Sequence, residues 1–402
     1  MFKSLNFKVI LFGFIFTFFS SFGQSFFLGL FNSSIRDALL ITHGQFGSIY
    51  ASATLLSSFI LVWIGKKIDD VNILKFSSFV IILLATSCFI FSKISSVIFL
   101  FFAIFLMRLS GQGLMSHTAT TTISRYFDRS RGKALSTTWL GLSLAEFTLP
   151  LFIVFLLNII EWRNIWISIS IIVILILPLV SFFLVRNVNL ESREVSSEEK
   201  KIEKEIKQWK RIEVLKDYRF YIICINMLAM PWIATGTFVY QSYISTSKDW
   251  GPYIIAQSFM FYSILSVLTL FICGFLIDKF TSRKLLIYMN IPLLISVIIL
   301  FHFDTPVTAF IFLGLVGISN GFANILGSST WAELYGVKHL GSIKALTTAL
   351  MVFATAFGTA LFGFLIDIGF SVSDIAIVSG VYIFVSLILL FLIRKKLNPI
   401  II

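Results

Sequence analysis

The sequence has few charged residues, few cysteines and little polar chain outside one central stretch. Charged side chains make up 13% of its 402 residues and hydrophobic side chains 57%, whereas about a quarter of a typical soluble domain is charged. A chain of this composition cannot cover its apolar surface with polar groups in water. The lipid bilayer is therefore its expected solvent.

Residues that hold metals or activate nucleophiles are also scarce. The three cysteines, Cys88, Cys224 and Cys273, fall inside apolar runs without metal-ligand spacing, and we interpret them as small packing residues. The four histidines are scattered, and His117 is expected to be packed or hydrogen bonded. Phosphate-binding loops, dinucleotide glycine patterns and serine nucleophile elbows are absent from the sequence. These absences predict no metal, no cofactor and no ATP-driven pump.

The basic residues behind the net charge of +12 are distributed as in a membrane protein and not as in a nucleic-acid-binding protein. If the N-terminus lies inside, most Lys and Arg residues gather in the cytoplasmic connections, as the positive-inside rule requires. The exceptions in the opposite connections are Arg36, Lys93, Arg163 and Lys248. We therefore expect both termini in the cytoplasm and the chain in the plasma (inner) membrane, surrounded by lipid.

Twelve apolar runs have the length of about 20 residues that crosses a bilayer. They span approximately 8–31, 46–64, 73–92, 96–119, 134–158, 163–185, 219–244, 253–277, 284–302, 306–331, 342–365 and 373–393. The expected fold is an all-α membrane protein with twelve transmembrane helices in two pseudo-symmetric six-helix bundles. The first run lacks a cleavage site and is expected to remain as an uncleaved helix.

The one long polar stretch, residues 187–217, divides the chain into an N-terminal half, 1–186, and a C-terminal half, 218–402. Ser196 and Glu199 have the spacing of a capping box, which predicts a short amphipathic helix on the membrane surface. Three apolar residues recur at helical spacing after it: Ile202, Ile206 and Trp209. A regulatory or partner-binding element is one interpretation, and a solvated cytoplasmic tether is the favoured one.

Two landmarks recur about half a chain length apart. Gly65 precedes Asp69 by four residues, and Gly274 precedes Asp278 by the same spacing, with basic residues around both copies. Tyr126 and the following Lys-Ala-Leu-Ser are echoed by a tyrosine and Lys-Ala-Leu-Thr in the second half. This repetition indicates a duplicated unit, which is common in secondary transporters.

These residues resemble the loop signatures of major facilitator superfamily transporters. The match consists of Gly65-x-x-x-Asp69, then Gly274-x-x-x-Asp278-Lys279 with Arg283-Lys284, and Arg108-x-x-Gly111-x-Gly113 in the fourth run. The resemblance implies gating roles for Gly65, Asp69, Gly274, Asp278 and Arg283. It also implies that Asp69 faces the start of the eleventh helix near Gly341 and Ser342, and Asp278 the start of the fifth near Lys133 and Ala134.

Charged residues inside the membrane are the main functional candidates, because each costs about 3 kcal/mol at a helix centre. Arg108 in the fourth run and Glu146 in the fifth both reach mid-depth, and adjacent antiparallel helices could pair them. A structural ion pair is one interpretation. A site for a substrate anion and a coupling proton is the other, and intramembrane ionisable groups favour it by default.

The resemblance implies that helices one, four, seven and ten line a central cavity. Their polar or aromatic residues are then candidate substrate-binding residues: Ser20, Gln24, Arg108, Gln112, Trp232, Asn320 and Asn324. Hydrogen bonding between helices is the alternative role for each Asn and Gln.

We therefore predict a secondary transporter of a small solute, expected to be monomeric. Arg108 favours an organic anion such as a monocarboxylate, because a guanidinium binds a carboxylate with two donors. The tract from Arg129 to Leu135 is similar to a loop of the monocarboxylate and oxalate–formate branches. Proton symport through Glu146 is expected to accompany uptake. Alternatives are a transporter-like sensor or scaffold, an exporter of amphipathic compounds and a polytopic membrane enzyme, for which no catalytic constellation is visible.

Overall fold

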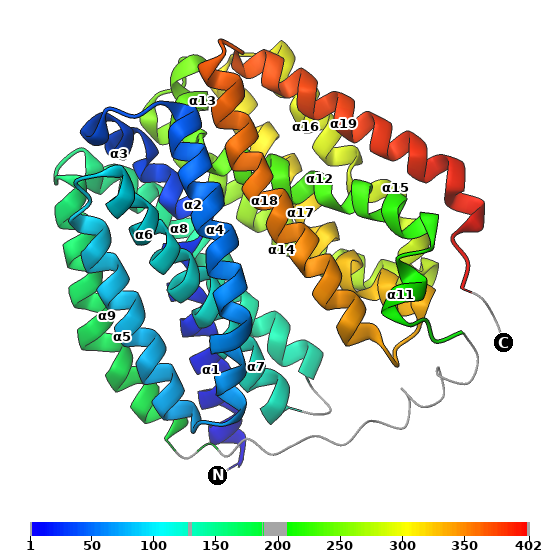
Figure 1. Cartoon of the computed structure of the whole chain (residues 1–402), viewed down its shortest axis with the longest axis horizontal. Coiled ribbons are helices and arrows are strands. Elements are labelled where there is room, and N and C mark those ends of the chain that lie inside the picture. The colour runs from blue at the N-terminus through cyan, green and yellow to red at the C-terminus, as the bar shows by residue number, and fades with distance from the viewer. Residues whose placement is uncertain (1, 128–130, 187, 189–206, 400–402) are drawn as a thin grey trace. The chain divides into compact units, whose positions relative to one another are not determined.

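A computed structural model describes residues 2–127, 131–186, 188 and 207–399, without the side chains of residues 2–5, 131, 278 and 328 (Figure 1). Within this part of the chain the secondary structure is helical, with no strand. Twelve of the helical segments found there are long and apolar enough to cross a membrane. The predicted all-α fold with twelve transmembrane helices is confirmed.

The chain forms two compact units that do not follow the sequence halves strictly. Unit 1 consists of Met1–Arg193, Phe238–Tyr243 and Thr359–Asp367, and unit 2 of Glu194–Thr237, Ile244–Gly358 and Ile368–Ile402. Parts of three helices from the second half of the sequence thus belong to unit 1. The predicted division at 1–186, 187–217 and 218–402 stays a proposal.

Unit 1 contains the helices of the first half. They are α1 (Phe2–Ser20), η1 (Ser21–Gly23), α2 (Ser25–Leu28), η2 (Gly29–Phe31), α3 (Asn32–Leu39), α4 (His43–Lys66), η3 (Lys67–Asp69), α5 (Ile73–Ser92), α6 (Val97–Met107), the π-helix η4 (Arg108–Met115), α7 (Ser116–Tyr126), α8 (Arg131–Leu157) and α9 (Trp162–Val185). Within unit 1, α1 packs on α8, α5 on α9, and α4 on α6 and η4.

The second half contributes the remaining helices. They are α11 (Arg211–Val214), α12 (Tyr218–Val239), α13 (Gln241–Ser247), α14 (Pro252–Phe280), α15 (Ser282–Met289), α16 (Ile291–His302), α17 (Pro306–Tyr335), α18 (Leu340–Asp367), α19 (Val372–Ile393) and η5 (Arg394–Lys396). Within unit 2, α17 packs along α14 and α16, and α16 also packs on α19.

The first membrane span is broken, whereas the sequence predicted one continuous run over 8–31. α1 ends at Ser20, and Gln24 is extended, with φ −81° and ψ 154°. Gly23 explains the break, because a Cβ there would overlap the main chain of η4, including the Gln112 nitrogen 2.5 Å away. The chain therefore leaves the helix at the point where it touches the fourth span.

Equivalent tyrosines end the fourth and tenth spans and make equivalent contacts. The Tyr126 hydroxyl donates to Asn6 Oδ1 at 3.1 Å, at the start of the first span. The Tyr335 hydroxyl donates to Asp217 Oδ2, also at 3.1 Å, just ahead of the seventh. Each pair lies within one unit. The repeat recognised in the sequence thus extends to side-chain hydrogen bonds.

Candidate functional site

Arg108 is a buried cation with a partly satisfied guanidinium group. Its side chain lies at the start of η4 and is 2% exposed. Nη1 donates to Gly23 O at 3.0 Å and to Ser25 Oγ at 3.3 Å. The guanidinium carbon lies 5.3 Å from the centre of the Tyr50 ring, whose hydroxyl is 3.2 Å from Ser25 Oγ. The Nε atom is buried and has no hydrogen-bond partner among the described residues.

The helical irregularities of unit 1 position this cation. The break at Gln24 frees the Gly23 carbonyl from a regular helix, so it can accept from Arg108. The wider turn of η4 lies opposite, and π-helical turns occur frequently at functional sites. Gly111 of η4 touches the break, because a Cβ there would lie 2.6 Å from the Gly23 nitrogen. Both main chains are thus distorted at the same crossing.

Arg108 has no anionic partner in the described part of unit 1. Four ion pairs within 4.0 Å are seen among the described residues, and none includes Arg108 or Glu146. The expected pairing of these two residues is therefore not observed. Glu146 lies half-buried on α8, without a hydrogen bond to any described residue. A buried guanidinium without a counter-charge is costly unless an anion completes it.

The other site residues predicted in the first half gather around the same crossing. Ser20 is buried and donates to Thr17 O at 2.7 Å, and its own carbonyl lies 3.4 Å from the Cβ position of Gly111. Gln24 and Gln112 are half-buried on either side of the contact. The structure thus brings Ser20, Gln24, Arg108 and Gln112 together, while their contact with a solute stays a prediction. Sequence reasoning missed Ser25 and Tyr50, because neither is charged or follows a recognised spacing.

The site residues predicted in the second half have separate surroundings in unit 2. Trp232 is 3% exposed, and its ring packs edge-on against Tyr382 with the ring centres 5.3 Å apart. Asn320 Nδ2 donates to Ser266 Oγ at 2.9 Å and so joins α17 to α14. Such hydrogen bonding between helices is the alternative to solute binding given above for Asn320. Asn324 is exposed on α17. Solute contact stays a prediction for all three.

The first loop signature is tied to the fourth span of its own unit. The carbonyl of Gly65 lies 3.0 Å from His117 Nε2 on α7, which agrees with the expectation of a hydrogen-bonded histidine. Asp69 Oδ1 pairs with Arg125 Nη1 at 3.2 Å, and Arg125 also donates to Ile68 O. This shared arginine holds the loop against the end of α7. The expected approach of Asp69 to the start of the eleventh helix stays a prediction.

The second loop signature is held differently. Glu333 of α17 accepts from the main-chain nitrogens of Ser282, at 2.8 Å, and Arg283, at 3.3 Å, and so satisfies the free donors at the start of α15. Gly274 has open space around its Cβ position, whereas Gly65 contacts His117. The side chain of Asp278 lies outside the described residues, so its predicted gating role stays a prediction. Glu333 was missed because it lies about 50 residues further along the chain.

The described end of the polar linker, residues 207–217, is packed within unit 2 through Trp209 and Val214. The interpretation of the whole linker as a solvated tether stays a prediction. Trp209 is 9% exposed, and its main-chain nitrogen donates to Tyr335 O at 3.0 Å. The Trp209 and Tyr335 rings meet edge to face at 5.4 Å. Residues 207–210 are not helical, so Trp209 packs here outside the amphipathic helix that was predicted to include it. The candidate cap, Ser196 and Glu199, lies outside the described residues, as do Ile202 and Ile206.

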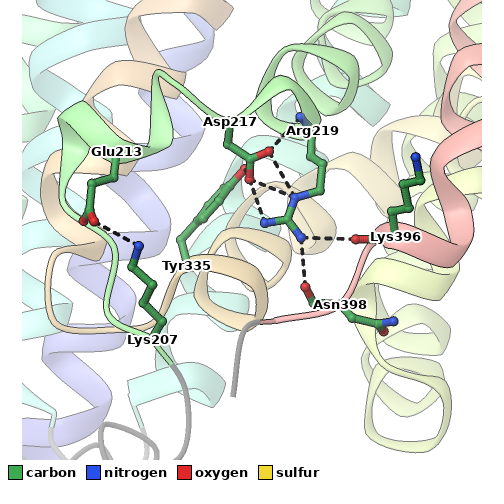
Figure 2. Close-up of polar contacts among 7 residues, drawn as sticks. All are labelled: Lys207, Glu213, Asp217, Arg219, Tyr335, Lys396 and Asn398. Atoms are coloured by element: carbon green, nitrogen blue, oxygen red, sulfur yellow. Dashed lines mark hydrogen bonds and ion pairs between the residues drawn. The ribbon is translucent and has the colours of Figure 1, made fainter. Parts of the chain in front are cut away.

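An ionic cluster follows Trp209 and joins the linker to the C-terminal segment (Figure 2). Arg219 donates through Nε and Nη2 to Asp217, each 2.8 Å from Oδ2, and their side chains are 11% and 5% exposed. Arg219 Nη1 also reaches the carbonyls of Lys396, at 3.1 Å, and Asn398, at 2.9 Å. Asp217 additionally accepts from Tyr335. One buried carboxylate thus connects the linker, α17 and, through Arg219, the end of the chain.

Asp217→Asn is expected to lower the free energy of unfolding by about 3 kcal/mol, because it leaves Arg219 buried without its counter-charge. The midpoint of thermal unfolding in detergent should fall accordingly. Glu213→Gln is the matched control, since Glu213 forms an exposed pair with Lys207 at 3.0 Å. Hydrogen bonds from the Lys210 main chain and the Lys207 ammonium lower the pKa of Glu213, but such surface pairs add little stability. Equal midpoints for the two variants would contradict the prediction.

Within the described residues, no three His, Cys, Asp or Glu side chains converge as in a metal site. A binding site for a resident cofactor is likewise not indicated by the residues around Arg108. The candidate site of unit 1 is a buried cation beside a broken helix, and such a cation can attract an anion.

Comparisons with known proteins identify the family and the fold. The family model described as Major Facilitator Superfamily matches residues 13–251 and 221–400. A solved structure of a bacterial homologue of the human lysosomal transporter Spinster, inward-facing and occupied, has a TM-score of 0.73 at 14% identity, covering 98% of this chain and 97% of the other. The nucleoside transporter NupG has a TM-score of 0.71 at 13% identity, with 98% of each chain covered. No curated protein matches this chain.

These structural neighbours share the fold, and the family model spans both halves of the sequence, including both loop signatures and the span that carries Arg108. The chain belongs to the major facilitator superfamily of membrane transporters.

Proposed function

We propose that this chain is a secondary transporter of a small organic anion, such as a monocarboxylate, which it moves across the plasma (inner) membrane by alternating access. Family membership makes it an integral membrane transporter and not an enzyme. The class of solute, the coupling ion and the membrane belong to the proposal. We further propose that both termini lie in the cytoplasm and that the chain acts as a monomer.

The main support for an anionic solute is the environment of Arg108. Its guanidinium is 2% exposed, retains a buried Nε without a partner, and forms no ion pair with a described residue. A carboxylate can accept two parallel hydrogen bonds from such a group. The alternative is that Arg108 only fixes the break in the first span through Gly23 O and Ser25 Oγ. That role would use one of its terminal nitrogens and would not require a permanent charge.

Gating by the two loop signatures is part of the same proposal. A carboxylate at a helix N-terminus gains about 0.3–1 kcal/mol from the helix dipole, which can bias an equilibrium between two conformations. Asp69 is half-exposed and already paired with Arg125, so it can exchange this partner for another. We propose gating roles for Gly65, Asp69, Gly274, Asp278 and Arg283 on these grounds.

Counterflow in proteoliposomes tests the proposed solute class. Vesicles loaded with an unlabelled monocarboxylate should accumulate the labelled compound transiently, which a sensor that only binds would not do. Parallel vesicles would receive a nucleoside, a sugar and a lipophilic cation. Exchange of the neutral compounds alone would contradict the anion assignment, and exchange of the lipophilic cation alone would favour an exporter of amphipathic compounds.

Glu146→Gln tests the proposed proton symport. An intramembrane carboxyl group without a fixed partner is a default candidate for a proton relay, and an amide cannot gain or lose that proton. We expect the variant to exchange solute within about two-fold of the parent but to lose accumulation driven by a pH gradient. Glu161→Gln is the control, because Glu161 is exposed at the start of α9. Accumulation that still responds to the pH gradient in Glu146→Gln would exclude Glu146 as the carrier.

A further inference from the structure

The last residue of α18, Asp367, binds the first turn of α4 within unit 1. Its carboxylate accepts from Thr42 Oγ1 at 2.6 Å, from the His43 main-chain nitrogen at 3.0 Å and from the Gly44 main-chain nitrogen at 2.8 Å. The first donors of a helix have no partners inside it and attract negative charge. Asp367 supplies that charge from a position more than 300 residues further along the chain.

The segments around this contact approach more closely than side chains would allow. A Cβ at Gly44 would lie 2.6 Å from Asp367 Oδ2, and one at Gly363 would overlap the carbonyl of His43. Tyr240, which is completely buried, places its hydroxyl 2.9 Å from His43 O and 3.1 Å from Thr359 O. The start of α4, the end of α18 and the end of α12 are therefore held together at one point.

Two further side chains join the end of α12 and the start of α13 to the first-half helices of unit 1. Asn32 Nδ2 donates to Val239 O at 2.9 Å, while Arg36 Nε donates to Asn32 Oδ1 at 2.8 Å. Gln241 Nε2 donates to Phe26 O at 2.8 Å. The bonds from Asn32 and Gln241 are made to main-chain carbonyls, whereas the Asp367 contact combines a charge with three donors. Loss of the Asp367 carboxylate would therefore remove a negative charge from the start of α4, which loss of the neutral hydrogen bonds would not do.

The same helix leads from this contact to the buried cation. Gly47 lies one turn below His43, and Tyr50 two turns below it, at about 10 Å along α4 from the ~1.5 Å rise per residue. Tyr50 contacts the guanidinium of Arg108. Residues spaced by three, four and seven positions share one face of a helix. The face of α4 that Asp367 holds at its start therefore covers Arg108 two turns deeper.

We propose that Asp367 is a gating residue: its carboxylate on the start of α4 holds this end of unit 1 closed, and its release admits solute from this side of the membrane toward Arg108. This inference rests on the proposed function, because it assigns a step of solute entry or exit. It adds a carboxylate gate at the end of α4 opposite to the Asp69 loop. The hydrogen bonds that Asp367 accepts from its three donors set the strength of this gate.

Cysteine accessibility tests the gate without any solute. The three native cysteines are buried, so a single reporter, Ala51→Cys, can be placed one turn below Gly47, where the native side chain is 8% exposed. Asp367→Asn should raise the rate of labelling by a membrane-impermeant maleimide about five-fold, the ratio that corresponds to about 1 kcal/mol. Asp374→Asn is the matched control, because among the described residues Asp374 accepts only from Ser371, in the capping box of α19.

The outcomes separate the gate from the solute assignment. Faster labelling in Asp367→Asn with an unchanged rate in Asp374→Asn supports the gate, even if every counterflow assay of the proposed anion fails. Equal rates in both variants overturn the gate, even if anion counterflow succeeds. If Asp367→Asn does not fold, Thr42→Val removes one of the three donors and should raise labelling about two-fold; an unchanged rate there also overturns the proposal.

Discussion

Arg108→Lys is expected to lower counterflow of the transported anion about 100-fold, although the formal charge is kept. The guanidinium reaches Gly23 O and Ser25 Oγ through one nitrogen and keeps others for a ligand, whereas an ammonium is a compact, strongly hydrated point charge that cannot reproduce the planar fork. A loss of about 2.7 kcal/mol is within the cost of disrupting a buried charge contact. Initial rates of counterflow in proteoliposomes, together with solute affinity, measure the effect.

Arg186→Lys is the matched control for this substitution. Arg186 is exposed at the end of α9 and lies over the ring of Phe182, so exchange of its cation should leave counterflow within about two-fold. Normal affinity in Arg108→Lys would point to a structural role of the arginine or to a solute without negative charge. Loss of affinity in the control as well would indicate a general loss of folded protein.

Gly23→Ala is expected to destabilise unit 1 by at least about 3 kcal/mol, at the upper end of what overpacking costs. The new methyl group would lie 2.5 Å from the Gln112 nitrogen and 2.9 Å from the Gly111 Cα. These are main-chain atoms of a packed helix, so no side chain can rotate away to make room. The thermal unfolding midpoint in detergent should fall, and Arg108 should lose its contact with Gly23 O as the first span moves away.

Gly327→Ala is the control for the glycine prediction, because a Cβ at Gly327 of α17 meets no atom within 4 Å. Added helix propensity should leave its unfolding midpoint unchanged or slightly higher. If Gly23→Ala unfolds at the parent temperature and transports normally, the first span and η4 can separate without cost, and the distortion at their crossing is not required for the site.

Much of the fold could be predicted from composition and periodicity. Each span must bury about 20 apolar residues in lipid, so the sequence marks the spans without knowledge of their neighbours. Arg108 could be recognised for the same reason, since a charge in such a run is costly and needs an explanation. The loop signatures and the repeated tyrosines further identified the family and its internal duplication.

The local details of the site could not be read from the same signals. The sequence predicted an unbroken first helix, whereas the chain breaks at Gln24 because Gly23 must touch η4. A pairing of Arg108 with Glu146 was considered from their depth alone, and depth does not state which face of a helix a side chain occupies. Trp209 was predicted to lie on the apolar face of an amphipathic helix, whereas residues 207–210 are not helical and the Trp209 ring packs against Tyr335.

Sequence by itself determined the number of spans, the membrane environment, the family and the presence of a cation within the fourth span, because each depends on hydrophobicity or on residues close together in the chain. Only the tertiary structure decided what surrounds that cation and what holds the helix ends. Ser25 and Tyr50 reach Arg108, Glu333 reaches the start of α15, and Asp367 reaches the start of α4, all through contacts between segments far apart in sequence. Free donors at a helix start are satisfied by whichever carboxylate the packing brings near, and a single sequence does not specify that neighbour.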